Sequence, residues 1–267
     1  DANVFKVINI GSTKKTIDFC KANNKKMLHI SSLSISGNVL EYNKNSQNNF
    51  SEQNLYIGQT LENIYIKTKF EAEKLILDNI SNGLHAQILR LGNITSRYSD
   101  GKFQINPSEN AFANRIKAFI YLKNIPDYLA THSIEFTPVD QCSNAIIKIM
   151  QNNISNYSVF HLYNPNFVKV VDLIKFLKSA SLPIEIVNKQ VFDFNVGNLL
   201  AEEKHRLSLS GIINDFNQNN DLVYHSNVKI LSSFTEKFLE LLDFNWNIID
   251  ELYIQKYINY LKSIKFI

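Results

Sequence analysis

The sequence predicts an α/β fold built on a parallel sheet, and three segments support this prediction. Two short apolar runs, Met27–Ser32 and Ala86–Leu91, are bounded by polar residues, as buried strands are. Between them, residues 61–79 have the periodicity of a helix with one apolar side. Strand, helix and strand in this order are typical of parallel sheets, because the helix returns the chain across the sheet.

The remaining segments extend this pattern in chain order. Residues 5–23 repeat apolar side chains at helical spacing and predict a helix, and the polar residues 41–53 predict a loop. After Arg97 the expected elements are a helix carrying Phe112, Ile116, Phe119 and Ile120, an extended segment at 135–139, a helix capped by Asp140, a strand at 159–163, a helix at 170–177, and two amphipathic tail helices at 234–242 and 248–261.

The composition excludes several classes of protein. With 28 basic and 25 acidic side chains, the net charge of +3 is too small to indicate a nucleic-acid partner. No apolar run approaches the roughly 18 residues that a membrane span needs. Two cysteines, Cys20 and Cys142, are too few for a disulfide framework and are compatible with a reducing cytoplasm, where we expect the protein.

Histidines and glycines exclude two kinds of site. The six histidines lack the spacing of metal ligands, so we expect no metal site. His29 and His161 lie in apolar strands, where we expect core residues with hydrogen-bond partners. The eight glycines are so widely spaced that the chain contains no Gly-rich phosphate loop.

The first candidate site is the Tyr-x-x-x-Lys motif of Tyr65 and Lys69 on the long helix. Residues four apart share one helix face, so the ammonium group can approach the phenol. A nearby cation favours the phenolate and lowers the pKa of tyrosine, which suits a group that exchanges protons near neutral pH. The motif alone is weak, because a half-buried tyrosine beside a solvated lysine is common.

The second candidate is Ser32, the last residue of the first predicted strand. The carboxyl ends of parallel strands face the ligand crevice in open α/β sheets, so a hydroxyl group there is well placed for a site. Ser31 and Ser34 compete for this role, because adjacent strand residues point to opposite faces.

The candidate residues lie in a characteristic order of elements. A strand ending in Ile-Ser-Ser-x-Ser precedes the Tyr-x-x-x-Lys helix, which precedes a strand ending in Arg90-Leu91-Gly92-Asn93. This order resembles that of the extended short-chain dehydrogenases/reductases. Upstream, Asn9-Ile10-Gly11-Ser12-Thr13 is similar to the family's Asn-Val-x-Gly-Thr helix motif. The resemblance implies a catalytic tetrad of Asn9, Ser32, Tyr65 and Lys69.

Four segments narrow this resemblance. They are Tyr65-Ile66-Lys67-Thr68-Lys69-Phe70-Glu71-Ala72-Glu73, Leu89-Arg90-Leu91-Gly92-Asn93-Ile94, Phe136-Thr137-Pro138-Val139-Asp140 and Phe244-Asn245-Trp246. Together they resemble the thioester reductase domains that terminate non-ribosomal peptide synthetases, relatives of the carboxylic acid and fatty acyl reductases. This narrower resemblance runs over nearly the whole chain. It implies the C-terminal part of a doubly wound Rossmann-type sheet with a smaller helix-rich subdomain. Residues 1–97 would be a partial dinucleotide-binding subdomain without its Gly-rich first half, and residues 98–267 a substrate-binding subdomain.

The resemblance also implies a reaction. NADPH, with NADH left open, would reduce a peptidyl or acyl thioester on a phosphopantetheinylated carrier domain to an aldehyde or alcohol. Ser32 and Tyr65 would hold the carbonyl oxygen, Lys69 would bind the nicotinamide ribose, and Asn9 would hold a water molecule of the proton relay. Gly92, Asn93 and Ile94 would line the nicotinamide pocket. The protein would be a monomer or part of a larger multidomain chain.

Two alternatives remain open from the sequence. A sugar-nucleotide epimerase or dehydratase would share Ser32, Tyr65 and Lys69, although the Thr-Pro-Val-Asp segment and the tail around Trp246 favour the thioester reductase. A non-catalytic fragment that docks a carrier domain is the alternative from another class of protein.

Overall fold

The computed structural model describes residues 2–39, 48–61, 63–152, 158–213, 215, 216, 222 and 226–267. The chain divides into two compact units, each assembled from separate segments. The first unit comprises Asp1–Gly92, Asn144–Tyr163 and His225–Asn245, and the second comprises Asn93–Ser143, Asn164–Tyr224 and Trp246–Ile267. The subdomain boundary proposed from the sequence, after residue 97, lies near the division between Gly92 and Asn93. Residues 144–163 and 225–245, however, belong to the first unit.

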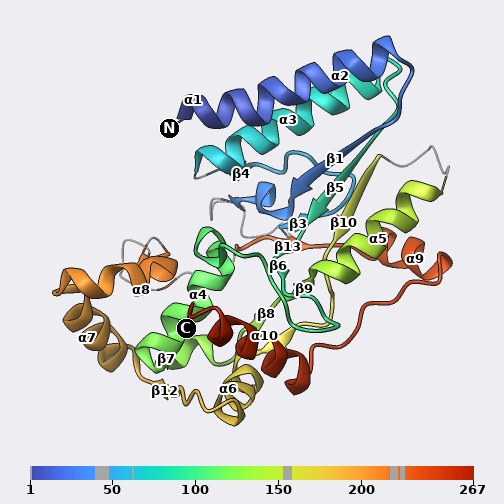
Figure 1. Cartoon of the computed structure of the whole chain (residues 1–267). Coiled ribbons are helices and arrows are strands. Elements are labelled where there is room, and N and C mark those ends of the chain that lie inside the picture. The colour runs from blue at the N-terminus through green and yellow to red at the C-terminus, as the bar shows by residue number, and fades with distance from the viewer. Residues whose placement is uncertain are drawn as a thin grey trace. The chain divides into compact units, whose positions relative to one another are not determined.

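A three-stranded parallel sheet forms the centre of the first unit (Figure 1). Its order is β1 (Met27–Ser32), β5 (Ala86–Leu91) and β10 (Val159–Leu162). Ser32 and Leu162 both pair with Leu91, so the three strands end level with one another. The predicted parallel α/β fold is confirmed, and β10 is the element that returns residues 144–163 to the first unit.

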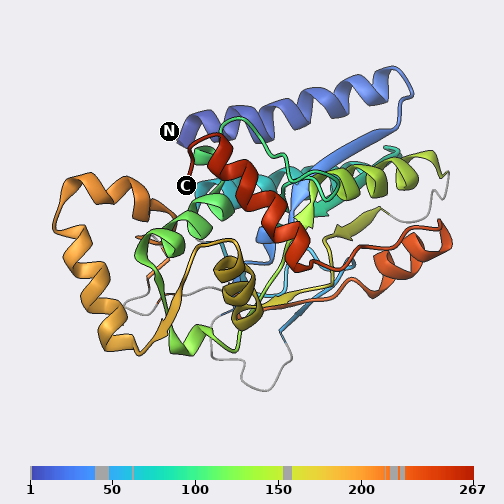
Figure 2. The ribbon, with the colours of Figure 1, turned by 60° about the horizontal axis from the view of Figure 1, so that its bottom comes forward.

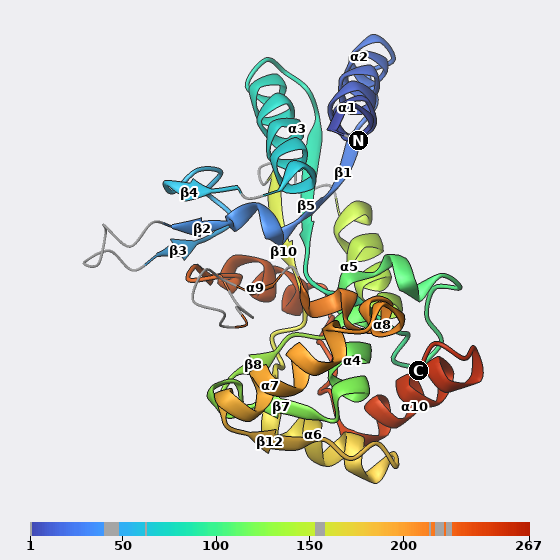
Figure 3. The same ribbon diagram turned by 90° about the vertical axis from the view of Figure 1, so that its left-hand side faces the viewer.

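Helices cover both faces of this sheet. On one face α2 (Ser12–Ala22) and α3 (Ile64–Ile80) lie side by side (Figure 3). Ile17 of α2 and Ile76 of α3 pack against Ile88 of β5. On the other face α9 (Ser233–Leu241) places two phenylalanine rings 5.7 and 5.4 Å from the ring of Phe160. Helices on both faces are the defining feature of a doubly wound sheet.

The predicted N-terminal helix is present but changes its winding. It consists of α1 (Ala2–Phe5), a π-helical segment η1 (Lys6–Gly11) and α2. The hydroxyl groups of Ser12 and Thr13 donate to the carbonyls of Ile8 and Asn9, the second at 2.6 Å. Hydroxyl groups bonded four residues back bend helices, and π segments are frequent at functional sites. Here Asn9 lies inside the π segment.

Short elements complete the first unit. They are the 3₁₀ helix η2 (Leu33–Ser36) and the two-residue strands β2 (Asn38–Val39), β3 (Asn49–Phe50), β4 (Gln59–Thr60) and β13 (Lys229–Ile230). The loop expected at residues 41–53 lies partly outside the described residues, and its described part contains β3.

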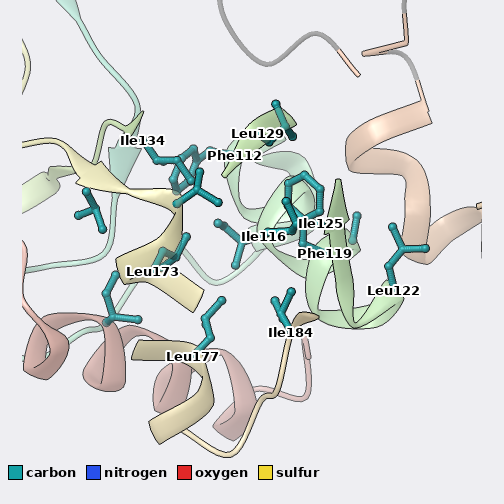
Figure 4. Close-up of a cluster of buried hydrophobic side chains, with 14 of the residues drawn as sticks. Phe112, Ile116, Phe119, Leu122, Ile125, Leu129, Ile134, Leu173, Leu177 and Ile184 are labelled. Atoms are coloured by element: carbon teal, nitrogen blue, oxygen red, sulfur yellow. The ribbon is translucent and has the colours of Figure 1, made fainter. Parts of the chain in front are cut away.

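The second unit has its own apolar core. Phe112, Ile116 and Phe119 of α4 (Ala111–Leu122) belong to the same cluster as Leu173 and Leu177 of α6 (Val170–Ser179) (Figure 4). The buried face of α10 (Glu251–Ser263) joins this cluster. Helices α4, α6, α9 and α10 confirm the predictions from periodicity. Two further helices, α7 (Lys189–Leu200) and α8 (Glu203–Ile213), pack on each other (Figure 2).

The remaining elements of the second unit are short. They are β6 (Ile94–Thr95), η4 (Pro107–Glu109), β7 (Asn124–Pro126), η5 (Asp127–Leu129), β8 (Ser133–Ile134), β9 (Thr137–Pro138), β11 (Val168–Lys169) and β12 (Glu185–Val187). None of the helices in the described part of the chain has the length and apolar character of a transmembrane segment.

The expected capping role of Asp140 is wrong. Helix α5 (Val139–Gln151) begins one residue earlier, so Asp140 lies in its first turn. Its carboxylate instead accepts hydrogen bonds from the backbone N–H groups of Tyr98 and Ser99, at 2.8 and 3.1 Å. Asp140 thus fixes the loop after β6 on the start of α5.

Gly211 of α8 marks a close helix contact that a substitution tests. A Cβ atom there would lie 2.2 Å from the backbone carbonyl carbon of Asn114 in α4, so one helix must shift. We expect Gly211→Ala to lower the free energy of unfolding by about 1–3 kcal/mol in urea denaturation. The matched control is Gly197→Ala in α7, where a Cβ meets nothing within 4 Å among the described residues and should stabilise by about 0.5–1 kcal/mol. Equal effects of the two substitutions would contradict the close contact.

Candidate active site

Ser32 stands at the carboxyl end of β1, where the chain turns into η2. Its Oγ accepts a hydrogen bond from the backbone N–H of Ser34 at 3.1 Å and donates to Ser34 Oγ at 3.0 Å. Ser32 is therefore the N-cap of η2, a position that fixes its side chain at the strand end. Ser31 is only 4% exposed, so its hydroxyl group is turned into the protein and the competition for the site reduces to Ser32 and Ser34.

Tyr65 and Lys69 lie one turn apart on α3, which begins after Asn63. Asn63 caps the helix by accepting from the N–H of Ile66 at 2.9 Å. Tyr65 is 39% exposed, and its ring meets that of Phe5 edge-on at 6.3 Å. Lys69 Nζ donates to the carbonyl oxygen of Ile30 in β1 at 3.0 Å. The pair thus connects the helix with the strand that ends at Ser32.

The expected lowering of the Tyr65 pKa by Lys69 is wrong for this structure. Partial burial raises the pKa of Tyr65 above its ordinary value, and burial lowers the pKa of Lys69 against the opposing effect of Glu73. The physical cause of the raised pKa is the partial burial of the phenol, and Lys69 donates its hydrogen bond to the Ile30 carbonyl. At neutral pH Tyr65 therefore keeps its proton, which suits a proton donor.

Asn9 is hydrogen-bonded to α3, the helix that carries Tyr65 and Lys69. Its Nδ2 donates to Thr68 Oγ1 at 2.8 Å, and Thr68 Oγ1 in turn donates to the carbonyl of Tyr65 at 3.0 Å. This chain of hydrogen bonds ties the π segment to the turn of α3 that carries Tyr65. The first unit therefore brings together the helices and the strand of all four predicted tetrad residues.

A buried ion pair, which was not predicted from the sequence, joins α3 to β5. Arg90 of β5 and Glu73 of α3 are 1% and 0% exposed, with Arg90 Nη2 2.8 Å from Glu73 Oε2. Arg90 Nη1 also lies 3.1 Å from His161 Nε2, and its guanidinium group stacks over the ring of Phe50 at 4.7 Å. A buried arginine needs a charged or hydrogen-bonding partner, so the position of Arg90 inside an apolar strand could have indicated this ion pair.

The two strand histidines differ. His161 confirms the prediction of a satisfied core residue, because Nδ1 lies 2.7 Å from the Leu231 carbonyl and Nε2 contacts Arg90. Burial and the charge of Arg90 lower its pKa to about 3. The prediction is wrong for His29, whose buried Nε2 has no hydrogen-bond partner among the described residues. Burial and the charge of Lys69 lower the pKa of His29 to about 4, so both rings are neutral at pH 7.

The segment after β5 passes from the first unit into the second. The Gly92 N–H donates to the Leu162 carbonyl at 3.0 Å, which extends the sheet of the first unit. In the second unit, the Asn93 carbonyl accepts from the Thr137 N–H at 3.0 Å and Ile94 pairs with Thr137. The Asn93 N–H donates to Glu135 Oε2 at 2.7 Å. No pattern in the sequence indicates a role for Glu135.

Glu135 is a partly buried acid with hydrogen-bond donors around it. Burial raises its pKa to about 7, and hydrogen bonds from Asn93 and Thr137 oppose this rise. Its charge in turn raises the pKa values of Cys142 and Tyr253, for which burial is the larger cause. Among the described residues no Lys or Arg forms an ion pair with Glu135, so its ionisation is uncompensated.

This environment predicts how stability changes with pH. Because the folded pKa of about 7 lies above the ordinary value of 4.5, the neutral carboxyl stabilises the fold below pH 4.5, and this stabilisation is lost as the pH rises to 7. Glu135→Gln keeps a neutral group, so its free energy of unfolding should exceed that of the wild type by up to about 3 kcal/mol at pH 8 and match it at pH 4. Denaturant titrations at both pH values measure the difference. A constant difference would contradict a proton on Glu135.

No group of three or more His, Cys, Asp or Glu side chains within the described ranges has the arrangement of a metal site. Cys20 and Cys142 are both buried free thiols.

The doubly wound sheet, the serine at a strand end and the Tyr-x-x-x-Lys helix define an extended short-chain dehydrogenase/reductase. A family model described as male sterility protein, an NAD-binding domain, matches residues 1–146. The chain belongs to this family.

Solved structures extend the likeness to the whole chain. A thiolation-reductase di-domain from an archaeal non-ribosomal peptide synthetase is 28% identical with a TM-score of 0.85, covering 100% of this chain and 55% of that one. The reductase domain of the aureusimine biosynthetic cluster is 22% identical with a TM-score of 0.80, covering 97% and 66% of the two chains, and shows the shared fold alone.

A curated relative is the glycine betaine reductase ATRR of Emericella nidulans, 29% identical over 121 residues. The matched part is 45% of this chain and 9% of that protein. The chain thus spans about half of the archaeal di-domain and under a tenth of the fungal reductase.

Proposed function

We propose that this chain carries the catalytic residues of an NADPH-dependent thioester reductase that releases a peptidyl or acyl chain as an aldehyde or alcohol. The observation that carries the proposal is the grouping of Asn9, Ser32, Tyr65 and Lys69 in one unit. The likeness to the archaeal di-domain supports it, since that protein is a reductase joined to a thiolation domain. By analogy, the substrate here is a thioester on the phosphopantetheine arm of a carrier domain in a larger multidomain chain, in the cytoplasm.

Each residue has a proposed task. Ser32 and Tyr65 hold the carbonyl oxygen of the thioester, where negative charge develops as the carbonyl carbon is reduced. Tyr65 gives its proton to this oxygen, and Asn9 holds a water molecule that resupplies the proton. The resulting hemithioacetal breaks its carbon–sulfur bond, so the carrier thiol leaves and an aldehyde remains. Residues 98–267 would bind the acyl chain.

The residues present fit a nicotinamide cofactor. Lys69 has three N–H donors, and its one described acceptor is the Ile30 carbonyl, so two donors remain for ribose hydroxyl groups. The half-exposed phenol of Tyr65 lies one helical turn away. When bound, the reduced nicotinamide supplies the hydride. Gly92, Asn93 and Ile94 would line its ring, and a choice of NADPH over NADH belongs to the proposal.

The test gives the intact protein three substrates in parallel: an acyl thioester on a phosphopantetheinylated carrier domain, the same acyl group on free pantetheine, and a sugar nucleotide. NADPH absorbance and the aldehyde product are followed. We expect turnover of the thioesters, faster on the carrier domain, and none of the sugar nucleotide. Turnover of the sugar nucleotide alone would favour the epimerase or dehydratase. Absence of all turnover and of dinucleotide binding would favour a docking fragment.

A further inference from the structure

Asn93 is held by both of its backbone groups. Its carbonyl accepts from the N–H of Thr137 at 3.0 Å, as part of the parallel pairing of β6 with β9. Its N–H donates to Glu135 Oε2 at 2.7 Å, and this second bond belongs to a side chain rather than to the strand ladder. The orientation of the Gly92–Asn93 peptide therefore depends on one carboxyl group. The proposed function assigns this peptide to the nicotinamide pocket.

Glu135 is the first member of a chain of hydrogen bonds that runs into the protein. Its Oε1 accepts from the Thr137 hydroxyl group, and Thr137 Oγ1 accepts from the N–H of Asn164 at 2.9 Å. Thr137 and Asn164 are both 0% exposed. Asn164 Nδ2 then donates to the Asn247 carbonyl at 2.9 Å. Because Thr137 is shielded from water, its bond to Glu135 Oε1 cannot exchange freely for solvent, whereas the bond from the Asn93 N–H to Oε2 lies nearer the surface.

The state of Glu135 changes the bond to Asn93. As a carboxylate, Glu135 accepts from two donors, and hydrogen bonds to a charged acceptor are about twice as strong as neutral ones. A proton on Oε1 faces the Thr137 hydroxyl group, which must turn, and leaves Asn93 with a neutral acceptor. A proton on Oε2 faces the Asn93 N–H directly and breaks that bond. Protonation on either oxygen therefore loosens the Asn93 peptide.

The groups that face Glu135 do not compensate its charge. Cys142 of α5 and Tyr253 of α10 interact electrostatically with Glu135, and Tyr253 also interacts with Asp140 of α5. All three are neutral or negative at neutral pH. The strand segments on either side contribute Asn93 and Thr137, which carry no charge. Burial raises the pKa of Glu135 to about 7, and no cation among the described residues lowers this pKa.

We propose that Glu135 is a positioning residue for the nicotinamide-facing peptide of Asn93, and that its ionisation tightens dinucleotide binding. The proposal rests on the proposed function, because it needs residues 92–94 to contact the cofactor. It assigns Glu135 no contact with the reacting atoms.

The test compares NADPH dissociation constants of wild type and Glu135→Gln in the intact protein, by nicotinamide fluorescence from pH 6 to pH 8.5. The ratio of variant to wild type is the measured quantity, because the phosphate of the cofactor titrates in both proteins. Glutamine keeps a neutral acceptor for Asn93 and a donor for Thr137. We expect a ratio near one at pH 6 that rises to about three to five at pH 8, the value of a charge-assisted bond against a neutral one. Glu185→Gln, on exposed β12, should stay at one throughout.

A second measurement needs no cofactor. The backbone amide resonance of Asn93 should shift with pH in the wild type, with a midpoint near neutrality, and stay constant in Glu135→Gln. A ratio that is independent of pH, or an Asn93 amide that does not titrate, would overturn the role of Glu135 while leaving the reductase proposal intact. Failure of both proteins to bind NADPH at any pH would instead overturn the proposed function, and the role of Glu135 with it.

Discussion

Tyr65→Phe should lower the rate of NADPH-dependent thioester reduction by about a hundredfold to ten-thousandfold, the usual contribution of a general acid. The substitution removes one hydroxyl group and keeps the ring, so the edge-on contact with Phe5 at 6.3 Å persists. Burial raises the pKa of Tyr65, so the wild-type group carries its proton at neutral pH and can donate it. Lys69 is unchanged in the variant, so NADPH affinity should remain close to that of the wild type.

Single-turnover reduction and nicotinamide fluorescence measure these two effects separately. The matched control is Tyr56→Phe, which removes a hydroxyl group from a 68% exposed tyrosine of the same unit. It should leave both quantities unchanged. A Tyr65→Phe protein that still turns over at the wild-type rate would contradict the role of Tyr65. A variant that loses NADPH binding together with turnover would show that the phenol acts in binding and not in proton transfer.

Arg90→Met should lower the free energy of unfolding by about 3–5 kcal/mol, because it leaves the Glu73 carboxylate buried without its partner. Arg90 and Glu73 are 1% and 0% exposed, and the guanidinium group also contacts His161 Nε2. Loss of the arginine therefore leaves two buried polar groups without a bond. The effect should be among the largest of any single substitution in the first unit.

Urea denaturation followed by circular dichroism gives the size of this effect. Arg97→Met is the matched control, because Arg97 pairs with Asp100 at the surface, where the two side chains are 43% and 40% exposed. Exposed pairs contribute about 0–1 kcal/mol, so this variant should unfold almost as the wild type does. Adding Glu73→Leu to Arg90→Met should restore part of the stability, since it removes the unpaired carboxylate. A loss below 1 kcal/mol for Arg90→Met would contradict a buried pair that fixes α3 to β5.

Local periodicity was sufficient to predict most elements of the fold. Met27–Ser32 and Ala86–Leu91 form strands with the predicted bounds, because apolar runs of this length have a strong local signal. The discontinuity of the first unit could not be predicted in this way. It depends on the pairing of β10 with β5, a contact between residues about 70 positions apart that leaves no trace in local spacing.

The candidate site likewise has features that local spacing predicts and features that depend on packing. Spacing along one helix was enough to place Tyr65 and Lys69 together, but it could not show that Lys69 donates to the Ile30 carbonyl of a strand. Glu135 was missed because its burial and its bond to Asn93 arise from the packing of segments more than 40 residues apart. A single glutamate at the start of an extended segment has no distinguishing pattern in the sequence.

The central claim is that the tetrad of this chain supports hydride transfer to the carbonyl carbon of a carrier-bound thioester. The most direct measurement incubates the intact protein with an acyl thioester on its carrier domain and with NADPH that bears deuterium at the transferable position of C4. Mass spectrometry then locates the label. We expect a free aldehyde with one deuterium on its carbonyl carbon, or an alcohol with two after a second reduction. Release of an unlabelled acid, or an acyl group that stays on the carrier while NADPH is unchanged, would contradict the account.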